Sequence, residues 1–197
     1  MAYPTVSAPY GLKPVNRLDG LPYAGATRQV KIASGYASNI FNGDLVQIDT
    51  NGQCIVSAVT TETNVYPVGV FVGCSYTNPS TKQKLFAQYW PTGTVAADAV
   101  AYVVDDPAAL FKVAVCSSGT TLSTVARAAI GSNISVIQNT GDTNTGNSKV
   151  AGVATPATTA QVLRVIDVVG ETATGADAFV EVIVKLNNHQ YNNTTGV

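Results

Sequence analysis

The amino-acid sequence predicts an all-β protein, built as a β-barrel or sandwich with at most one or two short helices. Short apolar runs rich in β-branched residues recur along the chain and are separated by turn-forming pairs such as Asn51-Gly52. Of the 197 residues, 46% are hydrophobic and only 12% are charged, so the chain can bury a sizeable core. The remainder is rich in Thr, Ser, Asn and Gly, a mixture typical of short strands joined by turns.

The first segment, residues 1–27, is predicted to form an extended N-terminal arm. Prolines recur in it at a spacing that no helix survives, at Pro4, Pro9, Pro14 and Pro22. Residues 1–31 carry four basic residues and one acidic residue, with tyrosines and leucines between them. We therefore expect the arm to become ordered against a partner, and its candidate contacts are Tyr10, Leu12, Lys13, Arg17, Tyr23 and Arg28.

The β-hairpin at residues 44–59 is the clearest single element. Its Asn51-Gly52 pair tolerates the positive φ angles of a type I′ turn, which predicts a two-residue loop. In that register Ile48 faces Ile55 across the hairpin. One buried face would then carry Val46, Ile48 and Ile55.

Further strands follow, separated by turn residues. The full set is predicted at residues 29–32, 44–48, 53–59, 65–72, 84–90, 95–104, 110–115, 134–138, 150–154, 161–169 and 179–186. The last two are expected to pair across the loop at residues 170–175. Because glycine has no side chain, neighbouring backbone can approach closely at Gly69 in the strand at 65–72 and at Gly73 just after it.

One short helix is predicted, over Thr121–Ala129. Its apolar residues recur at helical spacing, a threonine stands where an N-cap is needed, and Gly131 can end the helix. The all-β body is expected to span residues 28–191, either undivided or as two subdomains that meet near residues 105–107. Residues 192–197 are expected to form a flexible C-terminal tail.

The sequence offers little for catalysis or metal binding. The cysteines are odd in number and form no C-x-x-C pair, so we expect three buried free thiols, Cys54, Cys74 and Cys116. The single histidine, His189, is expected to be a surface or interface residue that forms hydrogen bonds. Together with Tyr191 it is the candidate contact between copies of the chain. No catalytic, cofactor-binding or metal-binding residue is predicted, and no enzymatic activity is expected.

Two patterns that resemble reactive sites are interpreted as turns. Residues 141–148 have the spacing of a phosphate-binding loop, but Asn147 replaces the lysine on which such a site depends. The same loop lacks the bidentate glutamate of a calcium site. The acidic pair Asp105-Asp106 precedes a proline and is expected to start a turn.

Charge and hydropathy argue against two classes of partner. The formal net charge of -1 is unlike that of proteins that bind nucleic acid by neutralising many phosphates. No apolar run is long enough to span a bilayer, and the start of the chain does not resemble a secretory signal. We therefore expect no nucleic-acid partner, no membrane partner, and synthesis in a host cytoplasm.

Five stretches together resemble a known family. They read PYGLKP, ASGY, GDLV, VGVFVG and NNHQY, and they lie at residues 9–14, 33–36, 43–46, 68–73 and 187–191. In their order and spacing the chain resembles the capsid decoration, or cement, proteins of tailed bacteriophages. The resemblance implies an all-β body of β-tulip or barrel type on the outer surface of the virion head, without catalytic activity or a cofactor.

The resemblance also implies partners. Such proteins bind the major capsid protein and one another, often as a homotrimer at local threefold axes and in some cases as a dimer between capsomers. The arm would lie across neighbouring capsid subunits, so its contact candidates would be capsid contacts that stabilise the shell. Deleting residues 1–26 would then abolish capsid binding and leave a folded oligomer.

Two other classes of function remain open. A head-fibre base, a minor head protein or a tail-tube component would also be a β-rich, non-enzymatic virion protein. The second class is a carbohydrate-binding β-sandwich on the virion surface, in which Tyr89 and Trp90 would form a stacking platform for a sugar ring.

Overall fold

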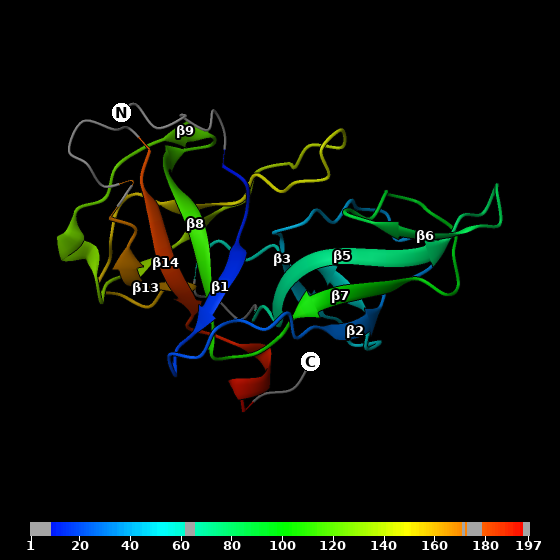
Figure 1. Ribbon diagram of the computed structural model, residues 1–197, viewed down its shortest axis with the longest axis horizontal. Helices are drawn as coiled ribbons and strands as arrows, with labels where there is room; N and C mark the ends of the chain where they lie inside the picture. The colour runs from blue at the N-terminus through cyan, green and yellow to red at the C-terminus, as the bar shows by residue number, and fades with distance from the viewer. Residues whose placement is uncertain (1–8, 62–65, 171, 173–178, 195–197) are drawn as a thin grey trace.

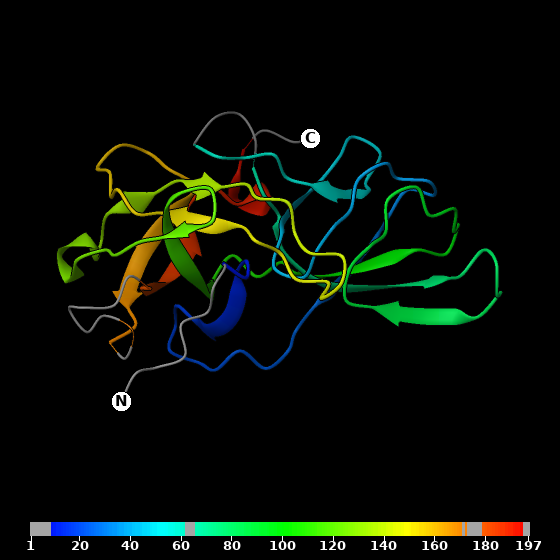
Figure 2. The same cartoon turned by 90° about the horizontal axis from the view of Figure 1, so that it is seen from above.

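The computed structural model of the chain describes residues 9–61, 66–170, 172 and 179–194. Its strands form a six-stranded and an eight-stranded sheet that lie side by side along the long axis of the molecule (Figure 1, Figure 2). The helices in the described residues are single 3-10 turns, η1 (Arg127–Ala129) and η2 (Gln190–Asn192). The predicted all-β fold, with a barrel-like sheet and only short helices, is confirmed.

The six-stranded sheet comes from the first half of the chain. Its strands are β2 (Arg28–Lys31), β3 (Leu45–Ile48), β4 (Cys54–Val56), β5 (Gly69–Thr77), β6 (Lys84–Ala87) and β7 (Val100–Val104). Their order is β2-β7-β5-β3-β4, and β6 pairs with the outer half of β5. Because β5 pairs with β7 along one edge and with β3 and β6 along the other, it organises this sheet.

The eight-stranded sheet combines the second half of the chain with one N-terminal strand. Its strands are β1 (Lys13–Arg17), β8 (Ala109–Ser118), β9 (Thr121–Leu122), β10 (Asn133–Ile134), β11 (Val136–Ile137), β12 (Ala151–Val153), β13 (Leu163–Val168) and β14 (Glu181–Leu186). Their order is β10-β13-β14-β8-β12-β11, and β1 and β9 also pair with β8. The ten-residue strand β8 therefore organises this half of the molecule.

Two apolar cores fill the molecule, one for each sheet, and strands β3 and β5 take part in both. Successive side chains of a strand point to opposite faces. Leu45 and Val70 accordingly enter the core of the eight-stranded sheet, whereas Val46 and Phe71 enter the core of the six-stranded sheet. All four side chains are buried, so these strands form a wall shared by the two halves.

The described N-terminal residues belong to the body of the protein. β1 pairs antiparallel with β8, from Lys13 opposite Lys112 to Arg17 opposite Ala109. Leu12, just before β1, is 0% exposed in the core of the eight-stranded sheet. A separate arm is therefore wrong for this part of residues 1–27, and residues 1–8 lie outside the described residues.

The predicted hairpin is present, but its register differs by one residue. Ile48 pairs with Cys54 rather than with Ile55. A shift of one residue moves side chains to the opposite face of a strand. Cys54 and Val56 therefore pack on the core of the six-stranded sheet in the place predicted for Ile55.

The side chain of Asp49 accounts for this register. Its Oδ1 accepts the backbone N–H groups of Asn51 at 2.9 Å and Gln53 at 2.8 Å. The loop consequently holds three residues between Asp49 and Gln53, and Gly52 takes a φ of +73°. This is a type I turn followed by a left-handed residue, the common alternative to the two-residue loop.

The helix predicted over Thr121–Ala129 is wrong. The backbone forms β9, which pairs with the end of β8, and then the single turn η1. Val125 and Ala129 are buried as the pattern required, but Val125 lies outside any helix or strand and Ala129 lies in the 3-10 turn. Threonine has a low helix propensity, so pairing with β8 prevails over a weak helical pattern.

Other sequence predictions are confirmed. β13 pairs antiparallel with β14, and Gly69 lies close to the backbone of Val104. The three cysteines are free and buried. Burial raises the pKa of Cys54 and of Cys74 to about 12, which keeps both thiols protonated at neutral pH.

A short C-terminal segment joins the two halves by hydrogen bonds. The Gln190 side chain accepts the N–H of Ile48 at 3.0 Å and donates to its carbonyl oxygen at 2.9 Å. The backbone N–H of Gln190 donates to the carbonyl of Pro67 at 3.0 Å. We call residues 187–192 the C-terminal clip. It includes the first residue of the predicted tail, whose last residues, 195–197, lie outside the described part of the chain.

Candidate docking surface

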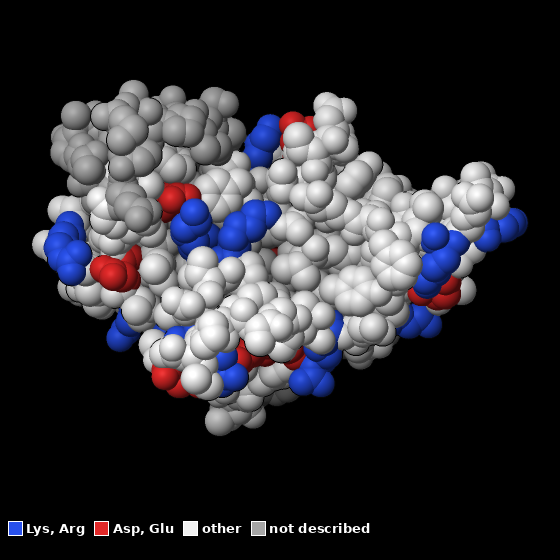
Figure 3. Space-filling model, viewed as in Figure 1, with Lys and Arg blue, Asp and Glu red and all other residues white. Residues whose placement is uncertain are grey.

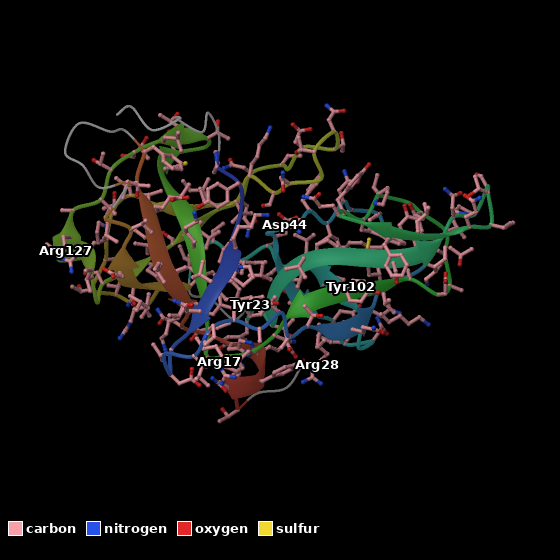
Figure 4. The ribbon with its side chains drawn as sticks, viewed as in Figure 1. Arg17, Tyr23, Arg28, Asp44, Tyr102 and Arg127 are labelled. Atoms are coloured by element: carbon pink, nitrogen blue, oxygen red, sulfur yellow. The ribbon has the colours of Figure 1, made fainter. Side chains whose placement is uncertain are left out.

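The crossing between the two sheets, residues 105–108, gathers several of the candidate contact residues. Figure 4 shows Arg17 and Arg28 at the lower side of the molecule, where the sheets meet, with Tyr23 above and between them. In Figure 3 basic and acidic side chains alternate along this edge, while much of the remaining face is uncharged. Two aspartates of the crossing, Asp105 and Asp106, anchor the arginines.

Arg28 is held in place by two groups. Its Nε forms a short ion pair with Asp105 Oδ2, and its guanidinium lies 5.5 Å from the centre of the Tyr191 ring. The carboxylate beside it raises the pKa of Arg28, so the group stays charged. Tyr191 is 45% exposed. The arrangement presents an aromatic ring and a positive charge to the outside, in a fixed relative position.

Arg17 is anchored in the same way, one residue further along the crossing. Its Nε lies 3.3 Å from Asp106 Oδ2, and its Nη2 lies 3.1 Å from Asp19 Oδ2. The tight loop after β1 exposes two apolar side chains, Leu18 at 52% and Leu21 at 57%. We call Arg17, Leu18, Leu21, Arg28 and Tyr191 the junction surface.

Of the remaining candidates near the crossing, Tyr23 supports the loop and His189 is buried. The Tyr23 hydroxyl donates to the carbonyl of Ala26 at 3.2 Å, and its ring packs partly on the core of the eight-stranded sheet. His189 is 2% exposed, so its predicted surface position is wrong and it cannot contact a second copy in this fold. Its Nδ1 accepts the N–H of Tyr191 at 3.2 Å.

The environment of His189 favours the neutral imidazole. Burial lowers its pKa, and the carboxylates of Asp105 and Asp106, together with the backbone of Val68 and Asp105, oppose this shift without cancelling it. Its Nε2 is buried and forms no hydrogen bond of standard geometry with the described residues. A proton on His189 would therefore place a buried charge where the C-terminal clip meets the crossing.

We expect the stability of the fold to decrease as the pH falls below about 6.5, the usual pKa of histidine. The pKa of His189 is lower in the folded chain than in the unfolded chain. The unfolded chain thus binds more protons over this range, and acidification favours unfolding. The measurement is the free energy of unfolding in urea as a function of pH.

His189→Asn is the matched variant for this measurement, because its side-chain oxygen can still accept the Tyr191 N–H and it takes up no proton. The stability advantage of the unmodified protein over the variant should shrink as the pH falls. A constant difference between the two proteins would contradict the expectation.

The other three arm candidates serve the fold. The Tyr10 hydroxyl donates to Glu181 Oε1 in a short hydrogen bond, and Lys112 Nζ lies 3.1 Å from the same oxygen. Burial and this carboxylate raise the pKa of Tyr10. Lys13 donates to the side chain and carbonyl of Asn42. With Leu12 in the core, these contacts hold the start of β1 to the body.

The proposed sugar platform is wrong for Trp90, because its ring is fully buried. It packs edge-on against Tyr76, with ring centres 5.3 Å apart. Tyr89 stacks on Phe41 at 5.6 Å, and Phe41 is itself buried. Tyr89 and Trp90 therefore do not form a joint exposed surface.

The loop at residues 141–148 is a polar turn, as predicted. The N–H of Gly146 donates to the carbonyl of Asp142 at 2.7 Å, and Asp142 Oδ1 accepts the N–H of Asn144. Among the described residues, no group of three His, Cys, Asp or Glu side chains is arranged to hold a metal ion. Neither of the described 3-10 turns is long enough to cross a membrane.

Comparison of the chain with protein-family models, with curated proteins and with solved structures found no match. The junction surface is therefore interpreted from its own geometry.

Proposed function

We propose that this protein is a structural component of a phage virion that binds the outer surface of the head and bridges neighbouring major capsid subunits. The observation that carries the proposal is the junction surface. It presents two arginines, a tyrosine and two leucines beside one another, and arginine and tyrosine are enriched among the residues that dominate binding energy at protein interfaces.

The anchoring of this surface supports a docking role. Asp105 and Asp106 fix the positions of Arg28 and Arg17 in the unbound protein, so less side-chain conformational entropy is lost on binding. Each contact can be weak, because a decoration protein that binds as a multimer touches several subunits at once and gains from effective concentration. Self-association as a homotrimer is part of the proposal.

The test is co-sedimentation of the purified protein with phage heads that lack it. Leu21→Ser combined with Tyr191→Ala is expected to weaken binding at least about tenfold, because two of the three exposed apolar side chains of the surface are lost. Phe86→Ser is the matched control, because Phe86 is an exposed apolar residue on β6 at the far end of the six-stranded sheet (Figure 1). Unchanged saturation of the heads by the double variant would refute this surface as the contact.

Stoichiometry distinguishes the proposal from the other virion roles. A decoration protein should be among the most abundant proteins of the particle, whereas a fibre base or a minor head protein should be scarce. Quantitative gel densitometry of intact particles provides this measurement.

A further inference from the structure

On the eight-stranded sheet lies a pair of cations that form no ion pair with a described carboxylate. Arg164 of β13 stands directly opposite Lys185 of β14. Like charges in this cross-strand position repel and destabilise a sheet. Neither side chain forms an ion pair with a described residue. The described carboxylates on the same two strands form ion pairs with other residues, Asp167 with Arg127 and Glu181 with Lys112.

Arg164 borders a cavity of about 400 Å³ whose lining is mostly polar: Asn133, Thr158, Ala160, Gln161, Arg164 and Asn187. The residue that orients the guanidinium is Asn133, which is itself buried. Asn133 Oδ1 accepts Arg164 Nε at 3.1 Å and Asn187 Nδ2 at 2.9 Å. Asn133 Nδ2 in turn donates to the carbonyl of Thr159 at 2.9 Å.

These hydrogen bonds occupy one nitrogen of the guanidinium and leave the other two. Nε is engaged by Asn133, while Nη1 and Nη2 have no partner among the described residues. Two parallel N–H groups at the end of an arginine match the two oxygens of a carboxylate. Such a ligand would also relieve the repulsion between Arg164 and Lys185.

We propose that the Arg164 cavity binds a carboxylate, held end-on by Nη1 and Nη2. The carboxylate is either a free small acid or the side chain of an acidic residue on a partner polypeptide. The site shares no residue with the junction surface, so separate substitutions test the two proposals.

The test is a titration of isotope-labelled protein at constant ionic strength, followed by NMR at the Arg164 Nε–H group and at the backbone amides of residues 133, 161 and 187. Sodium acetate is the free-acid probe. The peptide acetyl-Gly-Glu-Gly-amide is the side-chain probe, and its Gln analogue is the control. We expect saturable shifts with both carboxylate probes and none with the Gln peptide.

Arg164→Gln is expected to weaken acetate binding by about tenfold or more, because the charged hydrogen bonds are lost. Arg127→Gln is the matched control, since it removes another exposed arginine of this half and should leave the titration unchanged. If Arg164→Gln does not fold, Arg164→Lys keeps the charge without the paired donors and should also weaken binding.

Shifts with acetate alone would mean that the site accepts free acids and excludes side chains. Similar affinities for acetate and the Glu peptide would mean that the site also accepts the carboxylate of an acidic side chain. Either result supports the proposal. Equal acetate affinity in the Arg164 and Arg127 variants would overturn it. Sulfate binding tighter than acetate would also overturn the assignment to carboxylates.

Discussion

Replacing Leu12 with alanine is expected to lower the free energy of unfolding by about 2–5 kcal/mol, the range measured for buried leucines. Leu12 has no exposed surface and packs in the core of the eight-stranded sheet. The alanine would leave a cavity that the surrounding strands cannot fill completely. Urea unfolding of the purified variant measures the change.

Leu18→Ala is the matched control for this prediction. Leu18 belongs to the same N-terminal segment, but its side chain is 52% exposed. Its substitution should change stability by less than about 0.5 kcal/mol, as at most surface positions. Equal losses in the two variants would mean that Leu12 does not hold β1 to the body.

The contacts of Leu12 and β1 with the body also determine how an N-terminal deletion must be interpreted. Removing residues 1–26 would take away β1 and the core residue Leu12 together. We expect such a protein to lose the eight-stranded sheet, so its failure to bind heads would say nothing about contacts. Point substitutions on the junction surface test docking without this ambiguity.

The strand β1 is hard to predict because proline disfavours both helices and central strands. Pro14 has no N–H to donate, and its ladder is interrupted by an irregularity between Pro14 and Asn16. Prolines are tolerated in strands at edges and bulges, and β1 has both features, since among the described strands it pairs with β8 alone and its ladder is irregular. The sequence shows apolar residues near the prolines, but it does not show that this segment pairs with β8.

Local patterns predicted most other strands but not the finer details. Alternation and turn residues found the hairpin at residues 44–59, whereas the hydrogen bonds from Asn51 and Gln53 to Asp49 decided its register. A pattern of side-chain types does not distinguish a two-residue loop from a three-residue loop. The register therefore required the geometry of one carboxylate.

The candidate surface was predictable in part. Arg17, Arg28 and Tyr191 stand out as residue types suited to interfaces. Their meeting at one place depends on the crossing between the sheets, because Arg28 and Asp105 lie 77 positions apart in the sequence. No local pattern indicates a pairing over such a distance, so Asp105 could be predicted only as a turn residue.

Replacing Gly69 with alanine is expected to destabilise the fold by about 3 kcal/mol, the upper end of the usual cost of overpacking. A Cβ at this position would overlap the carbonyl oxygen of Val104 and lie 3.1 Å from the Cα of Asp105. Neither group can rotate away, because both are main-chain atoms, one at the end of β7 and one at the start of the crossing. The start of β5 would have to separate from β7, and Asp105 would move with its ion pair to Arg28.

Gly170→Ala is the control that isolates this steric effect. Neither glycine has a positive φ angle, and a Cβ on Gly170 would meet no atom of the described residues within 4 Å. Both substitutions restrict the unfolded chain equally, so their difference reports the contact with the crossing. Thermal unfolding should show a melting temperature for Gly69→Ala at least about 6 °C below that of Gly170→Ala. Equal melting temperatures would mean that β5 can shift away from the crossing without cost, and the junction surface would then not be fixed by the packing beneath it.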